Sequence, residues 1–207
     1  MIFSTVNGAS NLSYFKALRA NEIFPEDIPT FSFSISEDEL TKFENIEMAG
    51  DYLVWNYLQG LDNKLIQAFV KRFKDRYGKN RSIGSPMMTA YMGVHLWAKA
   101  VERAGSSNVN KVKQTAIDLS IQGPGGMIYI EKKTQHTWMP IHIAKINKQN
   151  RLQSVWFSKV PIAPKPYPDS RTVEEWTQYI NNLQNSWGGT GRQHIDFSRL
   201  KRRRARG

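Results

Sequence analysis

Apolar residues recur at helical spacing in several stretches of the chain. Between Leu65 and Tyr77 they line one face, with lysines and arginines on the opposite face, and Gly78 follows where a helix would end. A longer helix is expected to open at Pro86 and to close at Gly105. Its apolar stripe is expected to comprise Met87, Tyr91, Val94, Trp97 and Val101. Shorter helices are expected after Ser10, over 108–118 and over about 173–187.

Short apolar runs between these helices indicate β-strands at 2–6, 28–35, 52–58, 127–131, 139–147 and 152–158. The first three runs alternate with helices, and this order is typical of βαβ units built on a parallel sheet. Ser36 and Glu39 fit a capping box that would open a short helix after the second strand. The last three runs are expected to pair as antiparallel strands. The pattern therefore predicts an α/β protein with a Rossmann-like parallel sheet and a small antiparallel C-terminal β element.

Changes in composition divide the chain into four segments. Residues 1–85 carry alternating strands and helices, 86–122 carry the long helix and a short one, and 123–191 carry a β-hairpin and a proline-rich crossing segment. Residues 192–207 are expected to form a disordered basic tail. The formal net charge is +11, and the tail contributes +6 of it. Such runs are usually solvated, and some bind phosphate-rich partners.

Few residues offer catalytic or metal-binding chemistry. The chain has no cysteine, and none of its four histidines (His95, His136, His142 and His194) has the spacing of a metal-ligand motif. The glycine cluster at 123–126 matches no phosphate-binding motif and is expected to form a turn that leads into the β-hairpin. We therefore expect no catalysis, no metal and no cofactor.

The best candidate for a binding site is the carboxyl edge of the predicted parallel sheet, where ligands bind in open α/β folds. The candidate residues are Asn7, Gly8, Ser34, Ser36, Glu37 and Asp51. Asp51 joins the others if its loop, which precedes the third strand, faces the same edge. Backbone amides at helix starts and short hydroxyl groups suit a small polar ligand. The alternative, in which Asn7 is a turn residue and Ser36 a helix cap, stays equally open.

The chain resembles the second half of the urea and short-chain amide binding proteins, which serve ABC transporters and have the type I periplasmic-binding-protein fold. The resemblance extends over about residues 2–189 and is carried, in order, by STVNGASNLSYFKAL, PTFSFSISEDEL, MAGDYLVWNYLQGLDN, FVKRFKDRYGKNR, PMMTAYMGVHLWAKAVERAGS, QHTWMPIHIAKI and PYPDSRTVEEWTQYINNLQNSWGG. A relative of these proteins acts as an amide sensor.

The resemblance implies that a ligand sits between two α/β lobes and that this chain begins near the middle of the second. Only the helices within 86–122 would belong to the first lobe, so the long helix would lack the sheet that its apolar stripe should cover. Asn7, Gly8, Ser34, Ser36 and Glu37 would lie on the second-lobe edge of the cleft. Asp51 would stand where a histidine or a neutral polar residue is expected.

The resemblance therefore predicts a truncated solute-binding component for urea or a short-chain amide, with a transporter permease as its partner. Because half of the cleft would be missing, we expect very weak binding or none. The family is periplasmic, but MIFSTVNG has no signal-peptide character, so the chain expressed as given would stay in the cytoplasm. No apolar run is long enough to span a membrane. The alternatives are an amide-sensing regulatory module and, less favoured, a tail that binds nucleic acid or another acidic partner.

Overall fold

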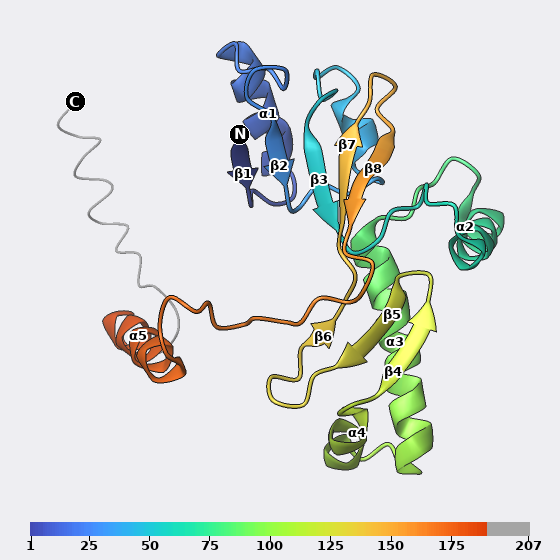
Figure 1. Ribbon diagram of the computed structural model, residues 1–207, viewed down its shortest axis with the longest axis vertical. Coiled ribbons are helices and arrows are strands. Elements are labelled where there is room, and N and C mark those ends of the chain that lie inside the picture. Colours follow the sequence, from blue (N-terminus) through green and yellow to red (C-terminus); the bar gives the residue numbers. More distant parts are fainter. Residues whose placement is uncertain (190–207) are drawn as a thin grey trace. The chain divides into compact units, whose positions relative to one another are not determined.

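The computed structural model describes residues 1–189 and divides the chain into two compact units, 1–164 and 165–207. The first unit contains a five-stranded sheet (Figure 1). Its strands, in spatial order, are β1 (Ile2–Ser4), β2 (Thr30–Ser32), β3 (Tyr52–Trp55), β7 (His142–Ile146) and β8 (Leu152–Phe157). The first three are parallel, and the last two run antiparallel to their neighbours. The expected α/β class is confirmed, and the sheet is mixed because the chain returns to it after a second substructure.

One face of this sheet is covered by α1 (Ser10–Ala20) and by the short 3-10 helix η1 (Leu40–Phe43). Alternation along β1, β2 and β3 turns Ser4, Thr30 and Leu53 inward. The core beneath the helices consists of Phe15, Ile35, Leu40, Phe43, Ile46, Met48, Leu53 and Ile146. The aromatic rings of Phe15 and Phe43 meet edge to face in this core, at 5.8 Å between centroids.

The helix caps expected at Ser10 and Ser36 are not formed. α1 begins at Ser10 itself, after Ala9, and no side chain caps it. After Ser36 the chain makes a turn, and the Ser36 hydroxyl donates to Asp38 Oδ1 instead of accepting a backbone N–H. The short helix η1 begins only at Leu40, with Glu39 as its N-cap residue and without a side-chain cap.

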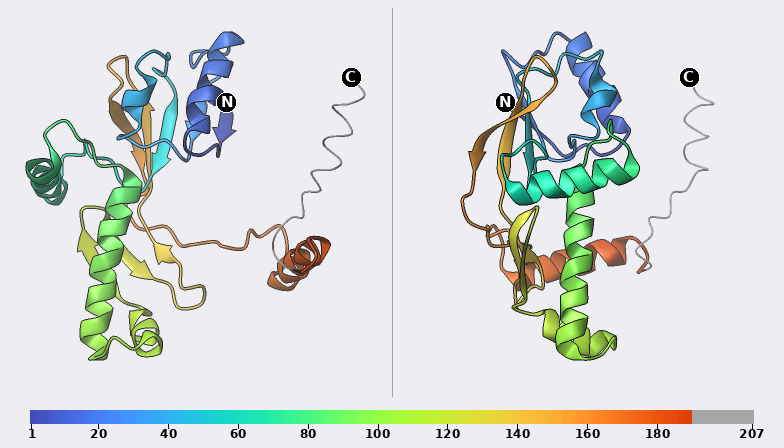
Figure 2. Two further views of the ribbon diagram at one scale, coloured as in Figure 1. Left: turned by 180° about the vertical axis from the view of Figure 1, so that it is seen from behind. Right: turned by 90° about the vertical axis from the view of Figure 1, so that its right-hand side faces the viewer.

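A second core lies below the first in Figure 1 and combines three helices with a three-stranded antiparallel sheet. Its elements are α2 (Lys64–Tyr77), α3 (Ser85–Ala104), α4 (Val109–Ala116), β4 (Ser120–Gly123), β5 (Gly126–Ile130) and β6 (Thr137–Trp138). Figure 2 shows α2 crossing α3, where Phe69 packs on Tyr91. Ile66 and Phe69 of α2 therefore belong to the same core as the buried face of α3.

The glycine cluster at 123–126 forms a tight turn, as expected, but it joins β4 to β5, whereas the sequence predicts a turn that precedes the hairpin. Gly123 pairs with Gly126 across the hairpin, and Gly126 has a φ of 83°, which favours glycine. A Cβ at Gly123 would lie 2.3 Å from Met92 Sδ, and one at Gly125 would lie 2.4 Å from Met88 Sδ. These two glycines therefore let the turn lie directly on the buried face of α3.

The buried face of α3 is not the stripe that the sequence indicates. Val94 and Trp97, which belong to that stripe, are 65% and 57% exposed. The fully buried apolar positions are Met88, Met92, Leu96 and Ala100. Both sets have helical spacing, so periodicity alone cannot distinguish them. No other element of residues 1–164 buries the uncharged face that carries Val94 and Trp97.

The second unit is described as far as Gly189 and holds α5 (Val173–Ser186). Thr172 and Glu175 form a capping box at its start, in which each side chain accepts from the other residue's backbone N–H. No residue of α5 is buried. Local capping and not core packing therefore fixes where this helix begins.

Replacing Asn63 with alanine is expected to lower the free energy of unfolding by about 1 kcal/mol, because Asn63 Oδ1 caps α2 by accepting from the backbone N–H groups of Leu65 and Ile66. Urea denaturation followed by circular dichroism measures the change. The same substitution at Asn110, which is exposed and caps nothing, is the control and should stay within about 0.5 kcal/mol of the parent. Equal losses in both variants would contradict the capping role.

Candidate functional site

The carboxyl ends of β1 and β2 form one polar edge of the five-stranded sheet. Ser34 joins the two loops there, since its hydroxyl donates to the carbonyl of Val6. Asn11, in the first turn of α1, donates from Nδ2 to Ser34 Oγ at 3.1 Å. The three groups hold the loop after β1, the loop after β2 and the start of α1 in one arrangement. We call this set, with Asn7 and Gly8, the strand-end site.

Asn7 and Gly8 lie in the turn between β1 and α1. Gly8 is exposed with a φ of 62°, and its carbonyl accepts from the N–H of Asn11. Because no side chain caps α1, the first N–H groups of the helix face this turn without a side-chain acceptor. Such N–H groups, with the helix dipole, attract carbonyl and carboxylate oxygens.

Asn11 belongs to this site although the sequence does not single it out. Its side chain is 2% exposed, and its Oδ1 has no hydrogen-bond partner among residues 1–189. A buried amide oxygen that accepts no hydrogen bond costs free energy. We therefore expect a group outside the described residues to donate a hydrogen bond to Asn11 Oδ1. The signal in the sequence is a polar residue at a buried position of an otherwise apolar helix face, and it could have been recognised there.

Ser36 and Glu37 follow β2 but turn toward the junction of the two cores. Ser36 is buried and bonded to Asp38, and a Cβ at Gly84 would lie 1.9 Å from Asp38 Oδ1. Glu37 accepts from the backbone N–H of Gln59. Burial raises the pKa of Glu37 to about 7, and the neighbouring Asp38 carboxylate adds to the rise. Glu37 also lines a hollow of about 610 Å³ with Gln59 and Arg151.

Asp51 does not join the strand-end site, and its predicted place there is wrong. It precedes β3, which is parallel to β2, so it lies at the amino edge of the sheet. Its Oδ1 accepts from the N–H of Thr30 at 2.7 Å, and its Oδ2 pairs with the guanidinium of Arg19. Burial raises the pKa of Asp51, and the bonds from Thr30 and Arg19 oppose this rise. Asp51 therefore holds α1 and β2 to β3.

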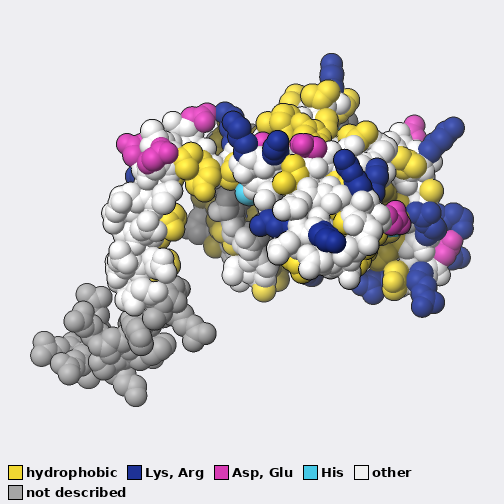
Figure 3. All heavy atoms as spheres, turned by 90° about the horizontal axis from the view of Figure 1, so that it is seen from below, with side chains coloured by type: hydrophobic (Ala, Val, Ile, Leu, Met, Phe, Trp, Pro, Cys, Tyr) yellow, Lys and Arg dark blue, Asp and Glu magenta, His cyan; other side chains and the backbone are white. Residues whose placement is uncertain are grey.

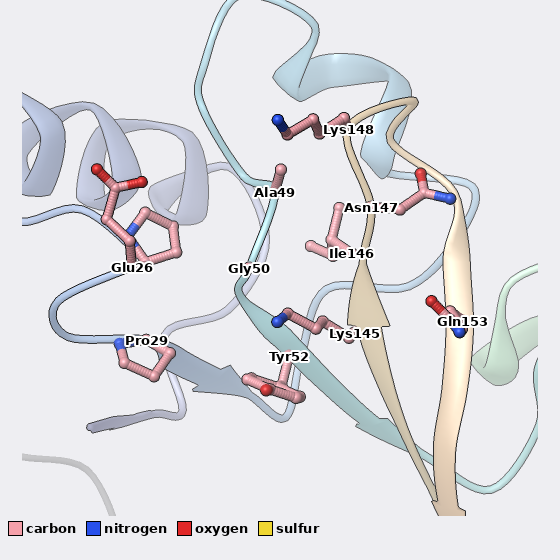
Figure 4. A pocket seen from close by; sticks show the side chains of 11 residues that line it. Glu26, Pro29, Ala49, Gly50, Tyr52, Lys145, Ile146, Asn147, Lys148 and Gln153 are labelled. Carbon is pink, nitrogen blue, oxygen red and sulfur yellow. The ribbon is translucent and has the colours of Figure 1, made fainter.

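A hollow of about 560 Å³ opens at this amino edge (Figure 4). Glu26 and Pro29 line one side of it, and Lys145 and Lys148 line the other. The Lys145 ammonium lies 5.7 Å from the centre of the Tyr52 ring, close enough for a cation–π contact. The Glu26 carboxylate offsets part of the positive charge of these lysines. We therefore favour the strand-end site over this hollow as the ligand site.

Among residues 1–189, no group of three or more histidine, aspartate and glutamate side chains could hold a metal ion. His142 lines a hollow of about 580 Å³ beside β8, and its ring stacks on Phe157. Burial lowers the pKa of His142, because desolvation disfavours the charged ring. His95 is exposed on α3 against Tyr91. His194 and the predicted basic tail, 192–207, lie outside the described residues. No helix of the described part is long and apolar enough to cross a membrane.

Residues 1–173 match the family described as periplasmic binding protein domain, and the chain belongs to this family. Its fold is that of the type I periplasmic binding proteins. It superimposes with a TM-score of 0.66 on a solute-binding protein of an ABC transporter from Rhodopseudomonas palustris HaA2, solved with p-hydroxybenzoic acid. That match has 20% sequence identity and covers 84% of this chain and 47% of that one.

Two other relatives extend this comparison. The leucine-, isoleucine-, valine-, threonine- and alanine-binding protein from Brucella ovis matches with a TM-score of 0.63 at 13% identity, over 82% of this chain and 46% of its own. A protein from Geobacillus stearothermophilus named limonene hydroxylase is 29% identical over 137 residues, which is 64% of this chain and 25% of that protein. The chain spans about half the length of the solved relatives.

Proposed function

We propose that this chain supplies one wall of a solute-binding cleft in the receptor of an ABC transporter, with the strand-end site as its binding surface. The observation that carries the proposal is the uncapped start of α1 beside Gly8, next to the hydroxyl of Ser34 and the amide of Asn11. Backbone donors and short polar side chains at the carboxyl edge of a parallel sheet form a ligand site in many α/β folds. Membership of the periplasmic binding protein family supports the same role.

The ligand class that we propose is urea or a short-chain amide. Such a molecule presents a carbonyl oxygen, which suits the free N–H groups of α1, and amide hydrogens, which suit Ser34 Oγ and Asn11 Oδ1. No positively charged side chain belongs to the strand-end site, so a carboxylate ligand would rely on backbone donors alone. Glu37, with a pKa of about 7, adds a partly ionised carboxyl group near the junction.

The opposite wall would come from an N-terminal half. This half would correspond to the part of the solved relatives that the present chain does not match. Two surfaces of this chain are suited to it. Within residues 1–164, β1 is an edge strand with which a further strand can pair, and the face of α3 that carries Val94 and Trp97 is exposed. A transporter permease is then the partner of the complete receptor, in the periplasm. With one wall alone, the affinity for solute is expected to be millimolar or weaker.

Nuclear magnetic resonance titration tests the proposal on the chain as it is. Urea or acetamide at millimolar concentration is expected to shift the amide signals of Gly8, Ala9, Ser10 and Ser34. Ser34→Ala should weaken the effect about fivefold, which corresponds to roughly 1 kcal/mol for one hydrogen bond. Ser120→Ala, an exposed serine in β4, is the matched control and should leave it unchanged.

The possible outcomes distinguish an error in the proposed site from an error in the proposed ligand class. If 4-hydroxybenzoate or leucine shifts the same signals at lower concentration than the amides do, the site stands and the amide class is wrong. If none of these solutes shifts them, or if the shifts lie at the amino edge near Lys145, the proposed wall is wrong. Micromolar affinity of the isolated chain would contradict the need for a second wall.

A further inference from the structure

The two cores within residues 1–164 are joined by segments of chain that lie close together, where β3, β7 and β8 converge on the start of α3 (Figure 1). The first segment is Asn56, since Trp55 before it packs in the core of the five-stranded sheet and Tyr57 after it packs in the second core. The second, 139–141, links β6 to β7, and the third, 158–162, leaves β8. Backbone hydrogen bonds of 2.8 and 2.9 Å join the second segment to the third.

The side chain of Asn56 connects the first segment to the second and to α3. It is 8% exposed. Its Oδ1 accepts from the hydroxyl of Ser85, and its Nδ2 donates to Thr89 Oγ1 at 3.2 Å and to Met139 Sδ at 3.5 Å. A thioether sulfur can only accept, so the amide nitrogen must face Met139, and the orientation of the amide group is fixed.

These contacts oppose any rotation of one core against the other. Hinges are a few residues at the ends of elements whose backbone dihedrals absorb a rotation, and the joining segments occupy such positions. A rotation that moves Asn56 away from its partners leaves buried polar atoms unpaired, and each lost hydrogen bond makes the rotated state about fivefold rarer. The same junction holds Gln59, whose Oε1 accepts from the backbone N–H of Ile83 at 2.8 Å.

We propose that Asn56 is the positioning residue that holds the two cores in one orientation, as a latch at their junction. The latch is a property of residues 1–164 and needs no ligand. Its consequence for a receptor rests on the proposed function. If an N-terminal half packs on α3, the orientation of the cores sets the gap between the two walls of the cleft.

A spin label on each core tests the proposal, and the chain suits this method because it has no cysteine of its own. Figure 3 views the second core from the side of α4, where lysine and arginine side chains stand out from the surface. Exposed lysines therefore offer the label sites, with Lys16→Cys on α1 in the first core and Lys113→Cys on α4 in the second.

Double electron–electron resonance is expected to give one narrow distribution of distances between the labels in the parent. Asn56→Leu should broaden it, because leucine has a similar volume and makes none of the three hydrogen bonds. Thr89→Val removes one acceptor and should raise the population outside the main peak about fivefold. Thr115→Val is the matched control. It removes a hydroxyl that bonds within α4, so the distribution should stay unchanged.

Hydrogen exchange separates a latch from a general contribution to stability. The backbone N–H groups of Gln59 and Ile83 lie at the junction, and Thr89→Val should speed their exchange about fivefold. The N–H groups of Phe15 and Met92, one in each core, should keep the rates of the parent.

Two results would overturn the proposal. One is an unchanged distance distribution in Asn56→Leu or, if that variant does not fold, in Thr89→Val. The other is exchange that accelerates equally at Phe15, Met92 and Ile83, which would make Asn56 an ordinary contributor to stability. The response of Gly8 to urea or acetamide should be the same in Asn56→Leu as in the parent, because the strand-end site lies in the first core. Absence of that response in both chains would therefore contradict the proposed function and leave the latch standing.

Discussion

Replacing Arg19 with methionine is expected to lower the free energy of unfolding by about 3–5 kcal/mol, because it leaves the buried carboxylate of Asp51 without its charged partner. Asp51 is 1% exposed. Arg19 also donates to the carbonyls of Ile23 and Glu47, each at 2.6 Å, so two further acceptors lose a donor. Methionine preserves most of the apolar length of the side chain, and the loss therefore reports the polar contacts.

The loss should grow with pH. Burial already raises the pKa of Asp51 in the parent, and removal of Arg19 raises it further. The folded variant can take up a proton at Asp51 at low pH, and it must keep a buried charge at high pH. Its free energy of unfolding therefore falls, relative to the parent, as the pH rises above the raised pKa that Asp51 has in the folded parent. Urea denaturation at pH 5 and pH 8 measures both effects.

Lys71→Met is the matched control, because it breaks the ion pair with Asp75 on the surface of α2. Lys71 and Asp75 are 77% and 56% exposed, so this change should cost less than about 1 kcal/mol. Arg19→Met combined with Asp51→Asn should recover part of the stability, since asparagine keeps an acceptor for the N–H of Thr30 without a buried charge. If Arg19→Met costs no more than Lys71→Met, the pair is not structural.

The sequence predicts best those elements whose signals are local. α2 has one apolar face and is followed by Gly78, so it is found where expected. The glycine cluster forms a turn, although the strand before it, β4, is not predicted. α3 has two apolar faces, and only the packing of the β4–β5 turn on Met88 and Met92 decides which is buried. Tertiary contact, which no local pattern contains, resolves such cases.

The strand-end site was predictable in part for a topological reason. Once β1 and β2 are recognised as parallel neighbours, Asn7 and Ser34 must share an edge. Asp51 precedes its strand instead of following it, and the same reasoning places it at the other edge. Its partner Arg19 lies 32 positions away on a helix, and no spacing rule indicates that pairing. Asn11 differs in part, because the sequence shows a polar residue on an apolar helix face but does not show its contact with Ser34.

Replacing Glu37 with glutamine is expected to remove a pH dependence of stability. The pKa of Glu37 is about 7 in the folded chain and about 4.5 when exposed, so the folded state binds more protons between these values. The parent's free energy of unfolding should therefore fall as the pH rises from about 4.5 to about 7, and then level off. The rise in pKa corresponds to about 3 kcal/mol at most. Glu37→Gln should thus match the parent at pH 4.5 and exceed it by up to about 3 kcal/mol at pH 8.

The physical cause is the burial of a carboxyl group at the junction of the two cores, beside Asp38 and the buried Tyr57. Glutamine keeps one oxygen that can accept from the N–H of Gln59, so the change isolates the cost of charge. Glu44→Gln, at an exposed position lining the same hollow, removes an equal charge and corrects for net charge. Parallel stability curves for the parent and Glu37→Gln from pH 4.5 to pH 8 would show that Glu37 ionises freely. The loop after β2 would then be open to solvent, and the burial of Glu37 at the junction would be wrong.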